Sequence, residues 1–453
     1  MYNKKYDLIV VGSGAGGFPA AIAAARRGLE VLLVERNAQI GGLLVSGLPI
    51  LAFLDRSGNP VVKGIGQEII DRLQALNGTK GHIPSPLLNS VTHVSAPWMS
   101  IILFEMCEQE ENLDVLLYAE LKEVKVDNGK MRGISVFCRG EEMVFEANLV
   151  IDATGDACVA YKAGAKYEKG DADGKGLQPP TITFELGNVD YEKLFDYLSE
   201  HPEGYKLPET FPGIEQTLDY FRSNICFTMM GFSDIVNEAR KTGELTIPRN
   251  MIDICRQVNG NTFVNVTRSI DTDVTDFESI IKAEFVCHKQ VKELVPFMQK
   301  YIPGFENAQL VSMIPFIGVR ESRRIVGKKQ LTLDNIKNLE LPEDTVAIAG
   351  YNVDIHSPDS ADMTMLTVKH GVGIPYGCLV PEYVEGLLMS GRTISVDQSA
   401  FAMTRVMSTC LAVGQAAGIA MAIAHKHGVL PSDIDVSELR AELKKDNALI
   451  ALD

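Results

Sequence analysis

Hydrophobic and polar positions near the N-terminus predict a parallel strand–helix–strand unit. Residues 6–11 (YDLIVV) are dominated by an apolar, β-branched run, which is typical of a strand buried on both faces. A glycine-rich loop and a helix-like run at 18–27 follow, and Gly28 ends that helix. The second strand is expected at 31–34 (VLLV), and it ends at Glu35.

The loop between the first strand and the helix has the glycine spacing of a dinucleotide-binding site. Gly12 permits the tight turn, Gly14 lets a pyrophosphate approach the backbone, and Gly17 lets helix and strand pack closely. The helix N-terminus offers free N–H groups to phosphates, and Glu35 lies where a carboxylate accepts hydrogen bonds from a ribose diol. The cofactor-binding residues predicted here are Gly12, Ser13, Gly14, Ala15, Gly16, Gly17, Glu35 and Arg36.

A second glycine pair and a predicted meander extend this unit. Gly41 and Gly42 follow the second strand, at a place where glycines could pass beside phosphates. A helix is expected at 97–111. Turn signals then separate three expected strands, at 115–126, 131–138 and 142–151. After the last strand, Gly155 would allow a dinucleotide to pass closely, and Asp156 could equally be a helix N-cap.

From about residue 160 to 370 the pattern changes to amphipathic helices with short strands between them. The clearest helix is 276–301, which Asp276 caps and in which apolar residues recur at spacings of three and four. Short strands are expected at 181–186 and 262–266. We expect this segment to be an inserted domain that covers one face of the cofactor.

The chain returns to the pattern of the first unit at 374–422. Gly391 lacks a side chain where a loop must pass close to something, and a buried helix is expected to begin between 404 and 409. Its N-terminus could stabilise negative charge on a bound cofactor, or the helix could serve packing alone. The apolar run at 410–424 is shorter than a membrane span and contains Gln415, so no membrane association is expected.

Charge and cysteine usage narrow the function classes. The chain has 43 Lys and Arg against 59 Asp and Glu, a formal net charge of -16, which argues against a nucleic-acid partner. The eight cysteines contain no CxxC pair and no Cys/His cluster has zinc spacing, so reduced thiols in a cytoplasm and no metal are expected. The N-terminus runs straight into the predicted first strand, so no signal peptide is expected.

These motifs resemble those of a mostly bacterial family of FAD-dependent oxidoreductases with a glutathione-reductase-type FAD fold, distantly related to fumarate reductase flavoprotein subunits. The resemblance covers nearly the whole chain. It rests on VVGSGAGGFPAAIAAARRG, ERNAQIGG, VIDATGD, IGVRESRRIVGKKQLTLDN, NVDIHSP, and IPYGCLVPEYVEGLLMSGRTIS followed by TRVMSTCLAVGQAAG. The histidine-rich pattern of true fumarate reductases has no match here, so that activity is not carried over.

The resemblance implies an α/β fold, with a Rossmann-like FAD-binding domain of three-layer ββα architecture and an inserted α+β substrate domain. The expected boundaries are 1–160 and 371–430 for the two parts of the FAD-binding domain, 161–370 for the inserted substrate or cap domain, and 431–453 for a helical tail. FAD is the expected cofactor, in an extended pose. Beyond the first loop, the residues expected to contact it are Gly41, Gly42, Leu43, Val124, Ala153, Thr154, Gly155, Asp156, Gly391, Asp397, Arg405 and Ser408.

Residues 317–325 (IGVRESRRI) place four charged side chains between apolar stretches. If the segment is a strand, Arg320 and Arg324 share one side with Ser322, while Glu321 and Arg323 share the other. Arg320 and Arg323 would either clamp an anionic substrate beside the flavin or tie the inserted domain to the FAD-binding domain. Arg324 is expected in solvent.

His356 is the best candidate for proton transfer, because its ordinary pKa suits acid/base work and Asp354 and Asp359 flank it. The alternative is a loop histidine with a purely structural role. With Arg320 and Arg323, it completes the predicted catalytic set. The activity expected is hydride transfer between a small, anionic organic substrate and flavin N5, in either direction.

Two other functions stay open from the sequence. The protein could be a flavoprotein subunit or carrier that passes electrons to a protein partner, and a homo-oligomer is equally compatible with the chain. An NAD-dependent dehydrogenase is disfavoured, because the C-terminal part returns to the cofactor.

Overall fold

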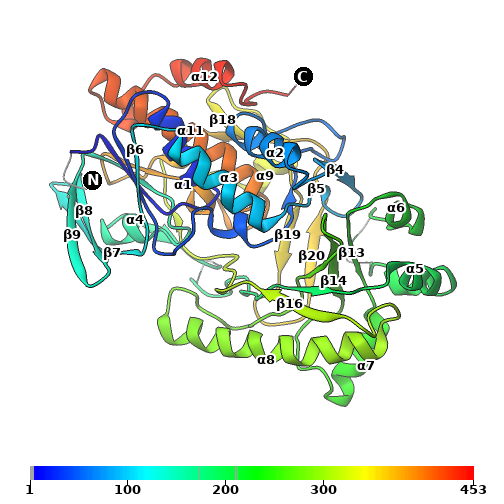
Figure 1. The fold of residues 1–453 in the computed structure, drawn as a ribbon. Helices are drawn as coiled ribbons and strands as arrows, with labels where there is room; N and C mark the ends of the chain where they lie inside the picture. Colours follow the sequence, from blue (N-terminus) through cyan, green and yellow to red (C-terminus); the bar gives the residue numbers. More distant parts are fainter. Residues whose placement is uncertain (1–4, 172, 210, 212, 453) are drawn as a thin grey trace.

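The computed structural model describes residues 5–171, 173–209, 211 and 213–452. Its centre is a five-stranded parallel sheet with the order β22-β10-β1-β2-β6 (Figure 1). The strands are β1 (Leu8–Val11), β2 (Val31–Val34), β6 (Leu113–Leu116), β10 (Leu149–Asp152) and β22 (Leu387–Met389). Every residue of β1, β2, β10 and β22 is buried, as the apolar runs predicted.

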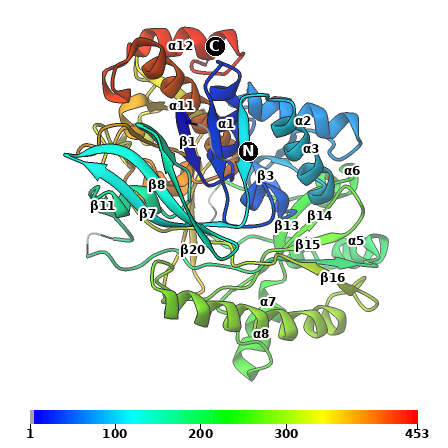
Figure 2. The ribbon, with the colours of Figure 1, turned by 60° about the vertical axis from the view of Figure 1, so that its left-hand side comes forward.

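Helices cover one face of this sheet and a β-meander lies on the other side, so the predicted three-layer ββα architecture is confirmed (Figures 1 and 2). The helices are α1 (Gly17–Ala25), α2 (Ile65–Ala75), α3 (Ala96–Glu108) and α11 (Met407–His427). The meander consists of β7 (Ala119–Asp127), β8 (Lys130–Cys138) and β9 (Glu141–Glu146). Two of the strands predicted from sequence are therefore each split between two sheets.

The splits have local causes in the backbone. The expected strand 115–126 breaks at Tyr118, which has φ 57° and separates β6 from β7. The expected strand 142–151 breaks at 147–148: the Ala147 N–H still donates to the Arg132 carbonyl of the meander, and β10 begins at Leu149 in the parallel sheet. Each break carries the chain out of one sheet and into the next layer.

Glycines let α11 pack against α1 at backbone distance. A Cβ at Gly414 would lie 2.2 Å from the Gly16 carbonyl oxygen, and one at Gly418 would lie 2.2 Å from the Ala20 carbonyl oxygen. The N-terminal helix α1 and the C-terminal helix α11 therefore pack directly against each other beside the glycine-rich loop. In the described part of the chain α11 is the one helix long and apolar enough to span a membrane, and 94% of its most apolar window is buried inside the protein.

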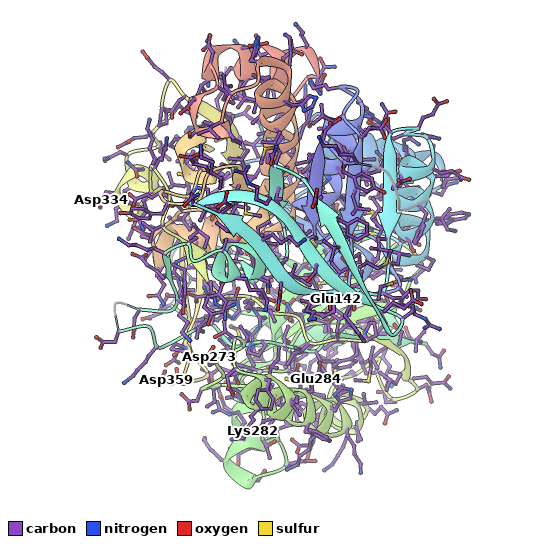
Figure 3. All side chains as sticks on the ribbon, turned by 90° about the vertical axis from the view of Figure 1, so that its left-hand side faces the viewer. Glu142, Asp273, Lys282, Glu284, Asp334 and Asp359 are labelled. Atoms are coloured by element: carbon purple, nitrogen blue, oxygen red, sulfur yellow. The ribbon has the colours of Figure 1, made fainter. Side chains whose placement is uncertain are left out.

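The middle of the chain builds a second, antiparallel sheet with the order β13-β14-β15-β12-β16. Its strands are β12 (Phe184–Gly187), β13 (Phe227–Gly231), β14 (Ile252–Arg256), β15 (Thr262–Val264) and β16 (Gln309–Met313). The long helix α8 (Phe277–Tyr301) runs below this sheet (Figure 1), and the side chain of Asp276 caps it as predicted. Figure 3 shows Lys282 and Glu284 on α8 and Glu142 on the meander. The predicted domain boundaries stay predictions.

The remaining elements are short or peripheral. The helices are α4 (Cys158–Lys162), α5 (Tyr191–Glu200), α6 (Leu218–Ser223), α7 (Ser233–Thr242), α9 (Leu333–Lys337), α10 (Gln398–Thr404) and α12 (Val436–Lys445). The strands are β3 (Ile50–Leu51), β4 (Ile83–Ser85), β5 (Asn89–Thr92), β11 (Tyr167–Glu168), β17 (Arg324–Ile325), β18 (Thr345–Ala349), β19 (Val353–His356), β20 (Met363–Leu366) and β21 (Val372–Pro375). Of these elements, β19 contributes Asp354 and His356 to the candidate site described below.

Candidate cofactor and substrate site

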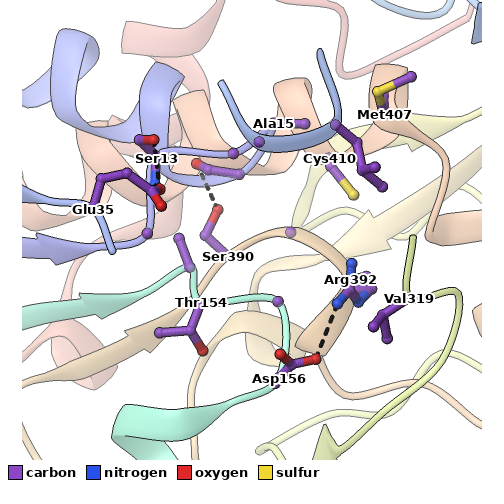
Figure 4. A pocket seen from close by; sticks show the side chains of 18 of the residues that line it. Ser13, Ala15, Glu35, Thr154, Asp156, Val319, Ser390, Arg392, Met407 and Cys410 are labelled. Atoms are coloured by element: carbon purple, nitrogen blue, oxygen red, sulfur yellow. Dashed lines mark hydrogen bonds and ion pairs between the residues drawn. The ribbon is translucent and has the colours of Figure 1, made fainter. Parts of the chain in front are cut away.

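The carboxyl ends of three parallel strands meet at one edge of the central sheet and line one side of a hollow (Figure 4). Its volume is about 880 Å³, counted with the space that opens to solvent. The loop after β1 contributes 12–16, the loop after β10 contributes 153–156, and the loop after β22 contributes 390–392. The segment after β2 adds a further wall. Residues far apart in the sequence thus form one cleft, as the sequence predicted.

Glycine is required at specific points of this cleft. A Cβ at Gly17 would lie 1.8 Å from the Gly12 carbonyl oxygen, and one at Gly16 would lie 2.6 Å from the Gly391 nitrogen. Gly12 has φ 95°, which disfavours a side chain. At Gly14, by contrast, a Cβ would meet no atom within 4 Å and would project into open space. The loop is packed tightly behind and open in front, which is the shape needed for a close approach of phosphates.

Glu35 holds the loop after β1 in place. Its Oε2 accepts hydrogen bonds from the Ser13 N–H at 3.0 Å and the Ser13 hydroxyl at 2.7 Å (Figure 4). Its Oε1 accepts from the backbone and side-chain nitrogens of Asn37, both at 2.9 Å. Glu35 is 6% exposed and lines the cleft, so a ribose diol could replace the Ser13 or Asn37 side-chain donors at its carboxylate.

A carboxylate that the sequence did not single out shapes the loop after β10. Asp152 Oδ1 accepts from the Thr154 N–H at 3.0 Å and hydroxyl at 2.7 Å, and its Oδ2 accepts from the Ala160 N–H at 2.8 Å. Burial nevertheless raises the pKa of Asp152. The Asp156 carboxylate pairs with Arg392 at 3.0 Å, while Ala157 is the N-cap of α4, so Asp156 is not the helix N-cap (Figure 4).

A second hollow, of about 850 Å³, opens from the first. The residues that line both are Leu43, Val319, Arg392, Arg405 and Met407. Its further walls come from the inserted sheet, from β19 and from the segment containing Arg320. The hollow is therefore continuous with the cofactor cleft and lies between the two sheets.

Arg320 is the predicted catalytic arginine that reaches this hollow. Its guanidinium donates to the Pro179 carbonyl at 2.7 Å and to the Asn265 side-chain oxygen at 3.4 Å. Among the described residues no carboxylate lies within 4.0 Å of it. Burial, with the neighbouring Arg405 and Arg249, lowers the pKa of Arg320 to about 9. A buried cation with neutral partners is a suitable anchor for an anion.

His356 also lines the second hollow, but two guanidinium groups donate hydrogen bonds to one of its ring nitrogens. Nδ1 lies 2.7 Å from Arg268 Nη2 and 3.3 Å from Arg249 Nη1, so it must accept hydrogen bonds. The ring proton is then on Nε2, which faces Asp354 Oδ1 at 3.4 Å. Burial and the nearby arginines hold the pKa of His356 well below its usual value.

Proton transfer by His356 stays a prediction, and in this arrangement a guanidinium group would first have to move away from Nδ1. Its partner Asp354 also contacts Arg405 Nη2 at 3.4 Å. Although burial acts in the opposite direction, His356, Arg405 and Arg320 hold the pKa of Asp354 below its usual range. The carboxylate of Asp359, predicted to flank His356, accepts a hydrogen bond from the Ser357 hydroxyl instead.

The other two arginines of the 317–325 segment lie outside the second hollow. Arg323 stacks over Tyr161 at 4.3 Å and donates to the Asp156 carbonyl, so it joins the 317–325 segment to the loop after β10. The expectation that Arg324 faces solvent is wrong: its side chain is 3% exposed and pairs at 2.5 Å with Glu321, which is fully buried. The segment is strand only at β17, so alternation does not set the direction of these side chains.

The predicted cofactor-binding residues divide into two groups. Those that line the cleft are Gly12, Ser13, Gly14, Ala15, Gly16, Glu35, Arg36, Gly42, Leu43, Ala153, Thr154, Gly155, Asp156, Gly391 and Arg405. Those that lie outside its lining are Gly17, Gly41, Val124, Asp397 and Ser408.

Each residue of the second group has another place in the fold. Val124 pairs with Ile134 within the meander, and Gly41 donates its N–H to the Ser13 carbonyl. Asp397 caps α10, and Ser408 donates to the Leu51 carbonyl at 2.5 Å. Gly17 supports the loop from behind. The cofactor contacts of both groups stay predictions.

Sequence reasoning missed several residues of the site. They are Asp152, Ser390, Arg392, Arg249, Arg268 and Asn265. Ser390 and Arg392 flank Gly391, so the glycine loop itself was a signal for them. Arg249 and Arg268 belong to no motif and meet His356 only through the tertiary fold.

Comparison with known proteins agrees with this geometry. The sequence profile of the family described as FAD dependent oxidoreductase matches residues 7–443. A tRNA uridine 5-carboxymethylaminomethyl modification enzyme, MnmG, from Endomicrobium trichonymphae is 28% identical over 170 residues. That match covers 34% of this chain and only 26% of the enzyme, so the chain spans about a quarter of its relative's length.

Two solved structures have a similar fold. A geranylgeranyl bacteriochlorophyll reductase-like protein from Thermoplasma acidophilum is 16% identical, with a TM-score of 0.50 over 98% of this chain and 84% of that one. GidA from Aquifex aeolicus is also 16% identical, with a TM-score of 0.51 over 95% of this chain and 65% of that one. At this identity the likeness concerns the fold alone.

The comparisons correct one expectation. The net charge of -16 was taken to argue against a nucleic-acid partner, yet the matched relative is named as a tRNA modification enzyme. Net charge describes the average surface and leaves local patches undetermined, so the exclusion of nucleic acid was wrong. With its glycine cradle, buried Glu35 and family profile over nearly all of its length, the chain belongs to the FAD dependent oxidoreductase family, and its cofactor is FAD.

Proposed function

We propose that the protein moves a hydride between a small, anionic organic substrate and flavin N5 of its FAD. When bound, FAD supplies two-electron redox chemistry. The observation that carries the proposal is the second hollow, which is continuous with the cofactor cleft. It contains the guanidinium of Arg320, which no carboxylate of the described residues approaches within 4.0 Å. A substrate in this hollow would lie within reach of both the FAD in the cofactor cleft and the Arg320 guanidinium.

In this proposal, separate residues bind the substrate, supply positive charge and limit water around the reacting atoms. Arg320 would bind the substrate's acidic group, because a guanidinium can form two parallel hydrogen bonds with a carboxylate. Arg405, held by Asp354, adds positive charge where the hollow meets the cofactor cleft. Leu48, Leu51 and Met407 line the same space with apolar surface, which would limit water around the reacting atoms.

His356 has a positioning role in this arrangement, and it would also exchange with the substrate the proton that accompanies the hydride, once a guanidinium group moves away from Nδ1. It accepts hydrogen bonds from Arg249 and Arg268 and so fixes two cations beside the hollow. We place the protein in a reducing compartment such as the cytoplasm, since all eight cysteines are free thiols.

The test is anaerobic mixing of the holoprotein with a panel of hydroxy, amino and saturated acids, each paired with its neutral amide. The visible flavin band reports reduction, and the photoreduced protein is mixed with enoates, quinones and oxygen for the reverse direction. An acid is expected to react where its amide does not. Reaction with quinones or a protein acceptor alone would favour the electron-carrier function instead.

Replacement of Arg320 sharpens this test. Arg320→Ala should leave the FAD content unchanged and slow the reaction with the acid by about tenfold to a hundredfold, the size of a lost charge-assisted hydrogen bond. Arg320→Lys keeps the charge and should retain part of the rate. Loss of FAD, with a normal rate in the fraction that retains it, would show that Arg320 serves architecture and would contradict its proposed role.

A further inference from the structure

A third hollow, the inner chamber, adjoins the second hollow and shares no lining residue with the cofactor cleft; its volume is about 520 Å³, counted with the space that opens to solvent. The two spaces share Asn265, Asp354 and His356, together with apolar residues of the 48–51 segment. Arg249, Asp253 and Cys255 line the inner chamber but not the second hollow. It is therefore a distinct space, and part of its polar wall comes from β14 and the residues just before it.

Two buried arginines next to this chamber have no ionic partner among the residues that the structure describes. Arg249 is 5% exposed, and its side chain contacts His356 Nδ1 at 3.3 Å. Arg268 is 1% exposed and contacts the same nitrogen at 2.7 Å and the carbonyls of Ser360 and Asp362. Within the described ranges no carboxylate lies within 4.0 Å of either guanidinium. A neutral imidazole cannot neutralise them.

The two carboxylates facing the chamber do not balance this charge. Asp354 lies within 4.0 Å of Arg405 and His356. Asp253 has the Cys255 thiol as its side-chain hydrogen-bond partner in the described structure, at 3.9 Å. The guanidinium groups of Arg249, Arg268, Arg320 and Arg405 thus meet Asp253 and Asp354 around the chamber. The further carboxylates that act on these arginines are the exposed Asp362, beside Arg268, and Glu321, which pairs with Arg324. Burial, together with Arg249 and Arg320, lowers the pKa of Arg268 to about 8.

Buried charge without a partner is costly, and a protein retains it where a ligand supplies the opposite charge. We propose that the inner chamber is a binding site for a compact acidic group, and that Arg249 is the residue that meets it. Arg268 and Arg320 add positive charge around the chamber. The acidic group is either the far end of the substrate, in which case the inference rests on the proposed function, or a free anion.

The experiment is thermal unfolding of the FAD-bound protein in acetate, succinate, phosphate or sulfate, with chloride at equal ionic strength as reference. In the wild type, at least one oxyanion should raise the melting temperature saturably, because it binds only the folded protein. Arg249→Met should weaken that apparent affinity by about tenfold or more. The matched control is Arg256→Met: Arg256 is at the end of β14, seven residues after Arg249, stacks over Tyr191 at 4.6 Å and lies outside both spaces.

Without an anion, Arg249→Met should melt no lower than the wild type, since it removes an unpaired buried charge. Arg249→Lys, which keeps the charge and loses the planar fork, should show intermediate protection and serves if the methionine variant fails to fold. The flavin spectrum shows whether the acidic group belongs to the substrate or to a free anion. Succinate that protects better than acetate and shifts the visible band identifies the far end of the substrate, whereas protection by phosphate or sulfate with an unchanged band identifies a free anion.

Equal protection of the wild type and Arg249→Met by every oxyanion, or protection of neither, would overturn the proposal. Failure of the proposed function has a different signature. If no acid reacts with the flavin while Arg249-dependent protection persists, the anion site stands and the hydride-transfer proposal fails.

Discussion

Replacing Gly14 by alanine should separate cofactor binding from folding. A Cβ at this position meets no protein atom within 4 Å, and Gly14 is not among the residues with positive φ. The unfolding free energy of the apoprotein should therefore change by no more than about 0.5 kcal/mol. The added methyl group would occupy the open space from which phosphates approach the loop.

The expected loss of FAD affinity follows from the number of N–H to phosphate hydrogen bonds that the methyl group would break. Displacement of a phosphate from one backbone N–H removes a charge-assisted hydrogen bond worth roughly 1.5–3 kcal/mol. The Kd for FAD should therefore rise by about tenfold to a hundredfold. Titration calorimetry of the apoprotein with FAD measures this change, and circular dichroism of the same sample shows whether it is folded.

Gly17→Ala is the matched comparison in the same loop. Its Cβ would lie 1.8 Å from the Gly12 carbonyl oxygen, a clash with backbone that the loop can relieve only by moving. This variant should lose stability as well as FAD. If Gly14→Ala bound FAD with the wild-type Kd, the diphosphate would not rest against this loop, and the reasoning would be refuted.

Two further predictions concern buried charge. Glu321→Ala leaves Arg324 buried without its partner and should lower the unfolding free energy by about 3–5 kcal/mol in urea titrations, whereas Glu142→Ala, in a surface pair with Lys122, should leave the midpoint unchanged. Burial raises the pKa of Asp253 from 3.8 to about 6, so the folded protein binds that proton more tightly than the unfolded chain, and stability falls as pH rises from about 4 to about 6. Asp253→Asn should remove this fall, worth about 3 kcal/mol, and an unchanged pH profile would contradict the buried position of the carboxyl.

The cofactor half of the site could be predicted from sequence because its constraints are local. A strand buried on both faces, a glycine that no side chain can replace and a carboxylate after the next strand each leave a mark in one short stretch. Gly391 was predicted in the same way, since the Gly16 backbone approaches it closely. Its neighbour Arg392 was missed, because an arginine after a glycine has no fixed partner until the fold supplies Asp156.

The substrate half could not be predicted in this way. Arg249 and Arg268 are 107 and 88 residues from His356 along the chain, and they meet only because β19 lies beside the inserted sheet. Arg324 shows the same limit. Its sequence context indicated a solvent-exposed side chain. The segment is strand only at Arg324–Ile325, so strand alternation could not give the direction of this side chain, which is buried and pairs with Glu321.

The most direct test of the account is a difference spectrum of the purified, FAD-bound protein on titration with small organic acids. A site in which Arg320 and the flavin face the same substrate predicts a saturable shift of the visible flavin band in the wild type and its loss in Arg320→Ala that still contains FAD. A protein that binds no FAD, or a band that responds identically in both proteins, would contradict it.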